Sequence, residues 1–123
     1  MKDLNLPETY KNPKITTDSK NGYVLIYGRS IPEYPDKFYQ QLSDWVEWYV
    51  TKKQPITIDF KIIYLNTGSW RNLLSILIMI EKAEIPYHIN WYYEEDDLQL
   101  LRAGEDLATL SGLKFDFIEV KEV

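Results

Sequence analysis

ITIDFKIIYL (56–65), NTGS (66–69) and WRNLLSILIMI (70–80) follow one another near the middle of the chain, and together they are the deciding stretch for its fold. Its first segment alternates with a period of two and is rich in β-branched and aromatic residues, which predicts a β-strand. The last segment is too long and too continuously apolar for a strand, so it predicts a buried helix. The four small polar residues between them therefore form a strand-to-helix junction.

The part of the chain before this stretch begins with a polar arm. Residues 1–12 carry proline and few apolar residues, so we expect them to be flexible, with a short edge strand following at 14–17. Asn21-Gly22 is a strong turn signal, and an apolar strand follows at 23–27. These two strands are predicted to form a hairpin.

A helix is predicted between this hairpin and the deciding stretch. Pro35 suits the first turn of a helix, and Pro55 prevents its continuation beyond about residues 52–53. Apolar residues spaced three and four apart predict its buried face: Phe38, Leu42, Trp45, Val46 and Tyr49.

After the deciding stretch, the pattern predicts a strand at 87–93, a helix at 98–110 and a final strand at 114–120. Leucines at helical spacing predict the apolar face of that helix: Leu98, Leu101, Leu107 and Leu110. Four consecutive acids, Glu94 to Asp97, precede it and complement its dipole. A magnesium or calcium site is the alternative for these acids, but they lack the alternating spacing of a calcium loop, so we expect no metal.

The order of elements predicts an α/β fold: one small domain over residues 1–123, with a mostly parallel central sheet, an N-terminal hairpin and three helices. In such a sheet, functional groups gather at the carboxyl ends of the strands. The junction 66–69 should lie on that edge, together with residues 28–30 and 94–97.

Composition narrows the possible functions. The chain has 123 residues, no cysteine and a formal net charge of -5, which argues against nucleic acid as a partner and favours protein partners. The apolar run 73–80 is too short to span a bilayer, so no membrane partner is expected. The absence of cysteine and of a signal pattern predicts a cytoplasmic protein. The 15% aromatic content suits either a filled core or a recognition surface.

The chain offers little for catalysis. Its one histidine, His88, lies inside a predicted strand, without the nucleophile and orienting partner that a histidine base needs. No serine motif of the hydrolase kind and no phosphate-cradling glycine loop is present. We therefore expect no enzyme activity, no catalytic residue and no cofactor.

The junction 66–69 allows two interpretations. Asn66 or Thr67 caps the helix, which is the commoner role of such residues. Alternatively, Thr67 accepts a phosphate, because the first amide groups of a helix have no intrahelical partner and its dipole is positive there. Local chemistry alone leaves both open.

Several blocks resemble the SiaC family of bacterial regulatory phosphoproteins, in order from about Leu4 to Phe117. They are IYGRSIPE (26–33), FY (38–39), YLNTGS (64–69), WYYEEDD (91–97), AGED (103–106) and Phe115. The resemblance implies a fold similar to the anti-sigma-factor antagonists of the STAS type, which agrees with the order of elements.

The resemblance also implies a function in signalling. In that family, a threonine of an Asn-Thr-Ser-Ser block is phosphorylated by a histidine-kinase-like protein kinase and dephosphorylated by a PP2C-type phosphatase. The unphosphorylated form binds and activates a diguanylate cyclase, and so controls cyclic-di-GMP and biofilm formation. Carried over, the acceptor is Thr67, with Ser69 as the second candidate.

Other residues become candidates for contacting the partner or the phosphate: Arg29, Asn66, Gly68 and Trp70. Gly68 stands where the family usually has serine, and Trp70 where a small or basic residue is usual. The alternative to a phosphorylation switch is a constitutive interaction module in which Thr67 is only a helix cap.

Overall fold

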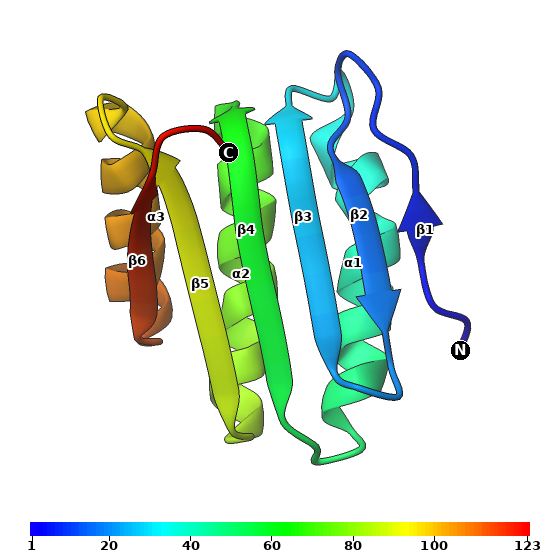
Figure 1. The fold of residues 1–123 in the computed structure, drawn as a ribbon. Helices are drawn as coiled ribbons and strands as arrows, with labels where there is room; N and C mark the ends of the chain where they lie inside the picture. The colour runs from blue at the N-terminus through cyan, green and yellow to red at the C-terminus, as the bar shows by residue number, and fades with distance from the viewer.

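Six β-strands form one sheet, and three helices lie along one of its faces (Figure 1), in a computed structural model that describes all residues from 1 to 123. In chain order the elements are β1 (Asn5–Leu6), β2 (Lys14–Asp18), β3 (Tyr23–Ser30), α1 (Pro35–Val50), β4 (Ile56–Leu65), α2 (Thr67–Ala83), β5 (Tyr87–Glu94), α3 (Leu98–Ser111) and β6 (Phe115–Val120). None of the helices is long and apolar enough to cross a membrane.

The strands lie in the sheet in sequence order, from β1 to β6. β1 and β3 run antiparallel to β2, whereas β3, β4, β5 and β6 are parallel neighbours. Because each right-handed crossover moves one strand in the same direction, α1, α2 and α3 all lie on the same face. The predicted hairpin and mostly parallel sheet are confirmed, and the other face of the sheet is left without helices.

The N-terminal residues, expected to form an arm, make specific contacts. β1 is a two-residue strand that the sequence did not predict, and its Leu6 and the preceding Leu4 pack against the core. The Asp3 carboxylate accepts hydrogen bonds from Trp45 Nε1 at 3.0 Å and from Thr17 Oγ1 at 3.1 Å. The segment before β2 thus reaches across to α1.

The core lies between the sheet and the helices. Trp45 and Tyr49 of α1 stack with their ring centroids 4.9 Å apart. The buried face of α1 is the predicted one, except that Tyr39 is buried while Phe38 is half-buried against its ring edge. Twenty-two buried apolar residues join into a single cluster, so one core holds the chain together.

The predicted apolar face of α3 was wrong in part, although Leu107 is buried as predicted and Leu101 is half-buried. Leu98 and Leu110 are exposed, and the buried positions are Leu100, Gly104, Leu107 and Ser111. The buried face of α3 is thus rotated about the helix axis relative to the predicted one, and Gly104 explains this rotation. A Cβ atom at Gly104 would come within 2.6 Å of the Trp91 indole, so the missing side chain lets α3 approach β5 closely. A count of leucines cannot reveal a helix that packs through a glycine.

A β-bulge lies near the end of β4. Gly28 pairs with Ile62 and Arg29 pairs with Tyr64, so Ile63 is an extra residue with no partner in β3. The bulge changes the alternation: Tyr64 shares the helix-free face with Arg29, and Leu65 packs against the core. It therefore sets the direction in which the chain enters α2.

β4 and β5 separate beyond the middle of the sheet. Their pairing runs from Ile56↔Tyr87 to Phe60↔Trp91 and stops there, although both strands continue. Figure 1 shows the two ribbons diverging toward their carboxyl ends, where β5 stays beside β6. Of the last five residues of β4, all but Ile63 pair with β3, and none pairs with β5.

Candidate functional site

The carboxyl ends of the parallel strands form one edge of the molecule, at the top of Figure 1. Residues 31–34 follow β3 there, Asn66 follows β4, and residues 95–97 follow β5. The three segments that the sequence placed on this edge are brought together as expected. We call this region the carboxyl edge.

Asn66 caps α2. Its side-chain oxygen accepts a hydrogen bond from the Ser69 amide at 2.9 Å. Its own amide donates to the Ser30 carbonyl at 2.9 Å, and its side-chain nitrogen donates to the Pro32 carbonyl at 3.3 Å. These bonds hold the start of α2 against the end of β3.

Thr67 is the first residue of α2 and its side chain is exposed. The N-cap bond comes from Asn66, so the threonine hydroxyl has no part in the cap. Of the two capping residues that the sequence allowed, the structure selects Asn66. Thr67 thus presents a free hydroxyl at the positive end of a helix.

Ser69, the second candidate acceptor, lies in a buried network of hydroxyl groups. Its side chain is 0% exposed. Its Oγ accepts from Ser30 Oγ at 2.8 Å and donates to the Ser30 carbonyl at 3.2 Å. Ser30 Oγ is in turn 2.6 Å from the Tyr39 hydroxyl, and burial raises the pKa of Tyr39 to about 12. The network fixes α1, β3 and α2 to one another, and an incoming kinase cannot reach Ser69 without opening it.

Gly68 lies where the starts of α1 and α2 meet. A Cβ atom built on Gly68 would be 2.4 Å from Pro35 Cγ, so a serine at this position requires the two helices to move apart. The Asn72 side chain joins the same contact by donating to Asp36 Oδ1 and to the Gly68 carbonyl, both at 2.8 Å. Glycine at position 68 therefore allows the close contact between α1 and α2.

Trp70 is half-buried between α2 and α3. Its Nε1 donates to the Ala103 carbonyl at 3.1 Å, and its ring packs against the core. The indole thus serves the contact between the two helices, and what it offers to a partner is its remaining exposed part.

Arg29 does not share a face with the start of α2. Its guanidinium lies 5.0 Å from the centre of the Tyr10 ring, on the helix-free side of the sheet. The cation nearest to Thr67 along the helix is Arg71, which is exposed one turn later. Arg71 follows Thr67 by four residues in the sequence, and this spacing alone would have identified Arg71 as the neighbouring cation on the helix.

Exposed apolar side chains are concentrated at the carboxyl edge. Five of the eight large hydrophobic residues that are exposed in this chain belong to segments at this edge: Tyr10, Tyr34, Ile63, Tyr64 and Leu98. Tyr34 is 69% exposed, Tyr64 58% and Leu98 68%. Large apolar surface gathered in one place is typical of a protein-binding site. Sequence periodicity missed these residues because exposure depends on the bulge and on the rotation of α3.

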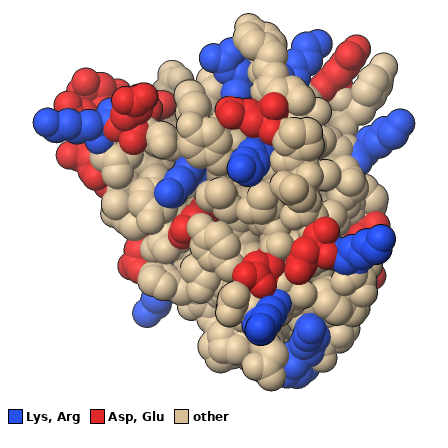
Figure 2. Space-filling view, turned by 45° about the vertical axis from the view of Figure 1, so that its right-hand side comes forward, with Lys and Arg blue, Asp and Glu red and all other residues tan.

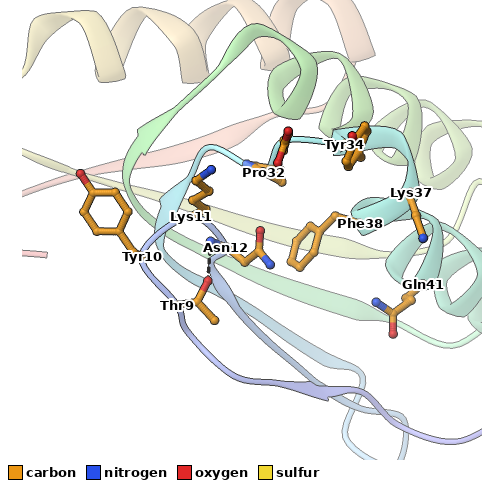
Figure 3. A pocket seen from close by; sticks show the side chains of 10 residues that line it. Thr9, Tyr10, Lys11, Asn12, Pro32, Tyr34, Lys37, Phe38 and Gln41 are labelled. Carbon is orange, nitrogen blue, oxygen red and sulfur yellow. Dashed lines mark hydrogen bonds between the residues drawn. The ribbon is translucent and has the colours of Figure 1, made fainter.

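A groove of about 720 Å³ extends this edge on the side of α1. Figure 3 shows the Phe38 ring facing it, with Lys11 and Lys37 also in its lining. A second recess, of about 630 Å³, shares Tyr34 and Lys37 with the groove and continues to Gly68 and Arg71. Charged side chains of both signs, Glu33 and Asp36 as well as Lys37 and Arg71, thus lie with Tyr34 around the start of α2 on this side.

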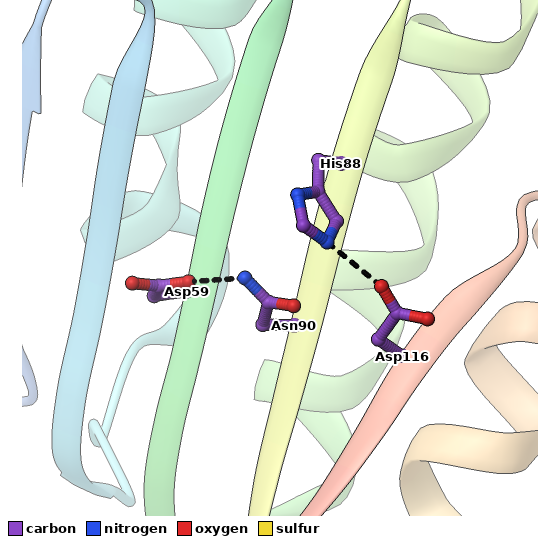
Figure 4. A network of polar contacts seen from close by, with 4 residues as sticks. All are labelled: Asp59, His88, Asn90 and Asp116. Atoms are coloured by element: carbon purple, nitrogen blue, oxygen red, sulfur yellow. Dashed lines mark hydrogen bonds and ion pairs between the residues drawn. The ribbon is translucent and has the colours of Figure 1, made fainter.

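The helix-free face of the sheet is polar. Asp59 accepts hydrogen bonds from Tyr23 Oη at 2.6 Å and from Asn90 Nδ2 at 2.9 Å, and His88 Nε2 lies 2.7 Å from Asp116 Oδ2 (Figure 4). His88 is exposed, and its ring nitrogen is engaged by a carboxylate rather than a nucleophile. No group of three or more His, Asp or Glu side chains is arranged to hold a metal ion.

A model of the SiaC family regulatory phosphoproteins matches residues 6–120. An uncharacterized protein of Pseudomonas aeruginosa (strain UCBPP-PA14) is 31% identical over 110 residues, which cover 86% of this chain and 87% of that protein.

Solved structures with the same fold include SiaC of Pseudomonas aeruginosa, with a TM-score of 0.81 and 30% identity over 96% of this chain and 97% of that one. Apo-SiaC from that organism gives a TM-score of 0.80 and 28% identity over 97% and 98% of the two chains. A third match is a chain in the crystal structure of the diguanylate cyclase SiaD in complex with its activator SiaC from Pseudomonas aeruginosa. Its TM-score is 0.90 and its identity 27%, over 96% of this chain and all of that chain.

Proposed function

The chain belongs to the SiaC family of regulatory phosphoproteins, and we propose that phosphorylation of Thr67 switches its binding to a diguanylate cyclase. It is a regulatory protein rather than an enzyme. In this proposal the unphosphorylated form binds and activates the cyclase, and the phosphorylated form does not. A histidine-kinase-like protein kinase adds the phosphate and a PP2C-type phosphatase removes it, in the cytoplasm, where such a kinase finds ATP.

The observation that carries the proposal is the position of Thr67. Its side chain is exposed at the start of α2, takes no part in the cap, and lies on the edge where Tyr34, Tyr64 and Leu98 are exposed. A kinase can reach this hydroxyl, whereas Ser69 is buried. A modification here therefore changes the surface that a partner is most suited to contact.

Phosphorylation at this position has a direct physical effect. It adds roughly two negative charges. The unpaired amide groups at the helix start tolerate these charges, so the fold need not change. A partner that docks on the surrounding apolar side chains, however, must desolvate the phosphate, which weakens binding.

A diguanylate cyclase is the partner that the relatives support. The TM-score is higher with the chain from the SiaD–SiaC complex, at 0.90, than with the two other SiaC structures, at 0.81 and 0.80. The chain is thus similar in structure to a chain of a complex that contains a diguanylate cyclase and its activator. A constitutive interaction module with Thr67 only as a cap has less support, because Asn66 supplies the cap.

Mass spectrometry after incubation with the cognate kinase and ATP tests the proposal. We expect one phosphate, on Thr67, and none on Thr67→Ala. Ser75→Ala is a matched control, since Ser75 is an exposed hydroxyl two turns further along α2. A phosphate at another residue, or normal phosphorylation of Thr67→Ala, would refute Thr67 as the acceptor.

A further inference from the structure

The ends of β4 and β5 leave part of the sheet unfilled. β4 continues for five residues beyond its last pairing with β5, from Lys61 to Leu65. β5 continues to Glu94, but it does so paired to β6 on its other side. Backbone groups of β4 that point toward β5 in this region therefore have no strand partner, which leaves them available to another chain.

A small cavity lies at this separation. It has a volume of about 120 Å³ and is mostly apolar, and its lining comes from the end of β4 and the start of α3. The lining residues are Ile63, Tyr64, Leu65, Asp97, Gln99, Leu100 and Ala103. Ile63 and Tyr64 remain exposed, because the bulge turns them away from the core. We call this site the β4–α3 cleft.

The β4–α3 cleft continues into an acidic groove. A second cavity, of about 600 Å³, shares Asp97 and Gln99 with the cleft and is lined further by Glu94, Glu95, Asp96, Leu98 and Lys121, so four carboxylates face one lysine there. Figure 2 shows acidic side chains gathered at the upper left corner, on the side where β5 ends and α3 begins in Figure 1. The single ion pair of the structure joins His88 and Asp116, so these acids have no ion-pair partner within the chain.

From this combination we propose that the β4–α3 cleft binds a segment of the target protein that inserts an apolar side chain beside Ile63 and places lysine or arginine residues against Glu94, Glu95 and Asp96. The apolar side chain matches the cleft, and the basic residues match carboxylates that form no ion pair, in a chain of net charge -5. Of these carboxylates, that of Glu94 accepts one hydrogen bond, from the Val123 amide at 3.1 Å. The inference rests on the proposed function, since it concerns the same partner. Leu65 of the cleft is two residues from Thr67, so the cleft belongs to the switched surface.

Calorimetric titration of the full chain with the diguanylate cyclase of the same organism tests the cleft. The double variant Glu95→Lys/Asp96→Lys reverses two exposed charges whose side chains form no hydrogen bond or ion pair within the protein. We expect its affinity to fall about tenfold or more, and we expect the wild-type affinity to weaken as salt rises from about 50 to about 500 mM. Glu47→Lys/Glu81→Lys is the matched control: it makes the same charge change near the opposite ends of the strands and should bind within about twofold of wild type.

The apolar half of the cleft is tested by Ile63→Asp, which should lower affinity about tenfold or more. Ile63→Ala, with circular dichroism of both variants, controls for loss of folding and should also weaken binding. If wild type binds the cyclase and the Glu95/Asp96 and Ile63 variants bind equally well, the cleft is not the binding site. If wild type does not bind the cyclase, the proposed function fails, and the partner assigned to the cleft fails with it.

Discussion

The helix-free face of the sheet and the carboxyl edge are both open to solvent, yet their side chains differ. On the helix-free face, polar groups bind one another: Asp59 joins Tyr23 and Asn90, and His88 joins Asp116. The Lys61 ammonium lies 5.0 Å from the centre of the Tyr92 ring. A face whose polar groups are already satisfied gains little from a partner.

The carboxyl edge is the opposite case. Tyr34 and Leu98 are exposed there, and the acids between β5 and α3 have no ion pairs. Apolar surface and unpaired charge both gain from burial against a suitable partner. The difference indicates that the absence of a covering helix does not by itself identify a binding surface. Exposed apolar side chains and charges without an ion-pair partner are the features that identify it.

Gly68→Ser should have the largest effect among changes at the carboxyl edge that leave Thr67 in place. The new Cβ would overlap Pro35, so we expect the free energy of unfolding to fall by about 1–3 kcal/mol. Urea denaturation measures this loss. In a Pro35→Ala background, Gly68→Ser should lower the free energy of unfolding by less. An equal loss in both backgrounds would show that contact with Pro35 does not cause the destabilisation.

The buried hydroxyl network should give the protein a pH-dependent stability. The pKa of Tyr39 is raised to about 12 by burial, against about 10 in an unfolded chain. Its contribution is therefore complete below about pH 10 and is lost as the pH rises through about 12, by about 3 kcal/mol in total. The difference in unfolding free energy between wild type and Tyr39→Phe should change over this range; a constant difference would contradict the role of the buried hydroxyl.

Asn66→Ala should destabilise the protein by about 1 kcal/mol through loss of the cap. Thr67→Ala should change stability by less than about 0.5 kcal/mol, because Thr67 is exposed and does not cap. Thermal unfolding of the two variants compares them directly. Equal losses would mean that the threonine shares the capping role.

The smallest effect is expected on the helix-free face. Asp59→Asn weakens the hydrogen bonds to Tyr23 and Asn90, and we expect it to cost about 0.5–1 kcal/mol of stability. Affinity for the cyclase should stay the same, since this face lies outside the proposed interface. A loss of affinity at Asp59 as large as that at Ile63 would remove the distinction between the two regions.

Much of this fold was predictable because local pattern and final structure agree. Period-two and period-3.6 patterns located β3 to β6 and all three helices, and the strand-to-helix junction located Asn66 and Thr67. β1 was missed because a strand of two residues has no periodicity of its own. The buried face of α3 was missed because its closest contact is made by Gly104 rather than by a leucine.

The site was less predictable than the fold because it depends on contacts between distant segments. The extra residue at Ile63 changes which side chains are exposed, and it becomes visible once β3 and β4 are paired. Likewise, the burial of Ser69 requires Ser30 and Tyr39 to meet it from β3 and α1. No pattern within the four junction residues contains that information.

A switch at Thr67 is tested most simply by measuring how one preparation of the protein binds the cyclase before and after phosphorylation. Stoichiometric phosphorylation at Thr67, verified by peptide mass spectrometry, should weaken affinity for the diguanylate cyclase by about tenfold or more while the circular dichroism spectrum stays the same. Treatment with a phosphatase should restore the original affinity. Equal affinity of the phosphorylated and unphosphorylated forms would contradict a switch at Thr67.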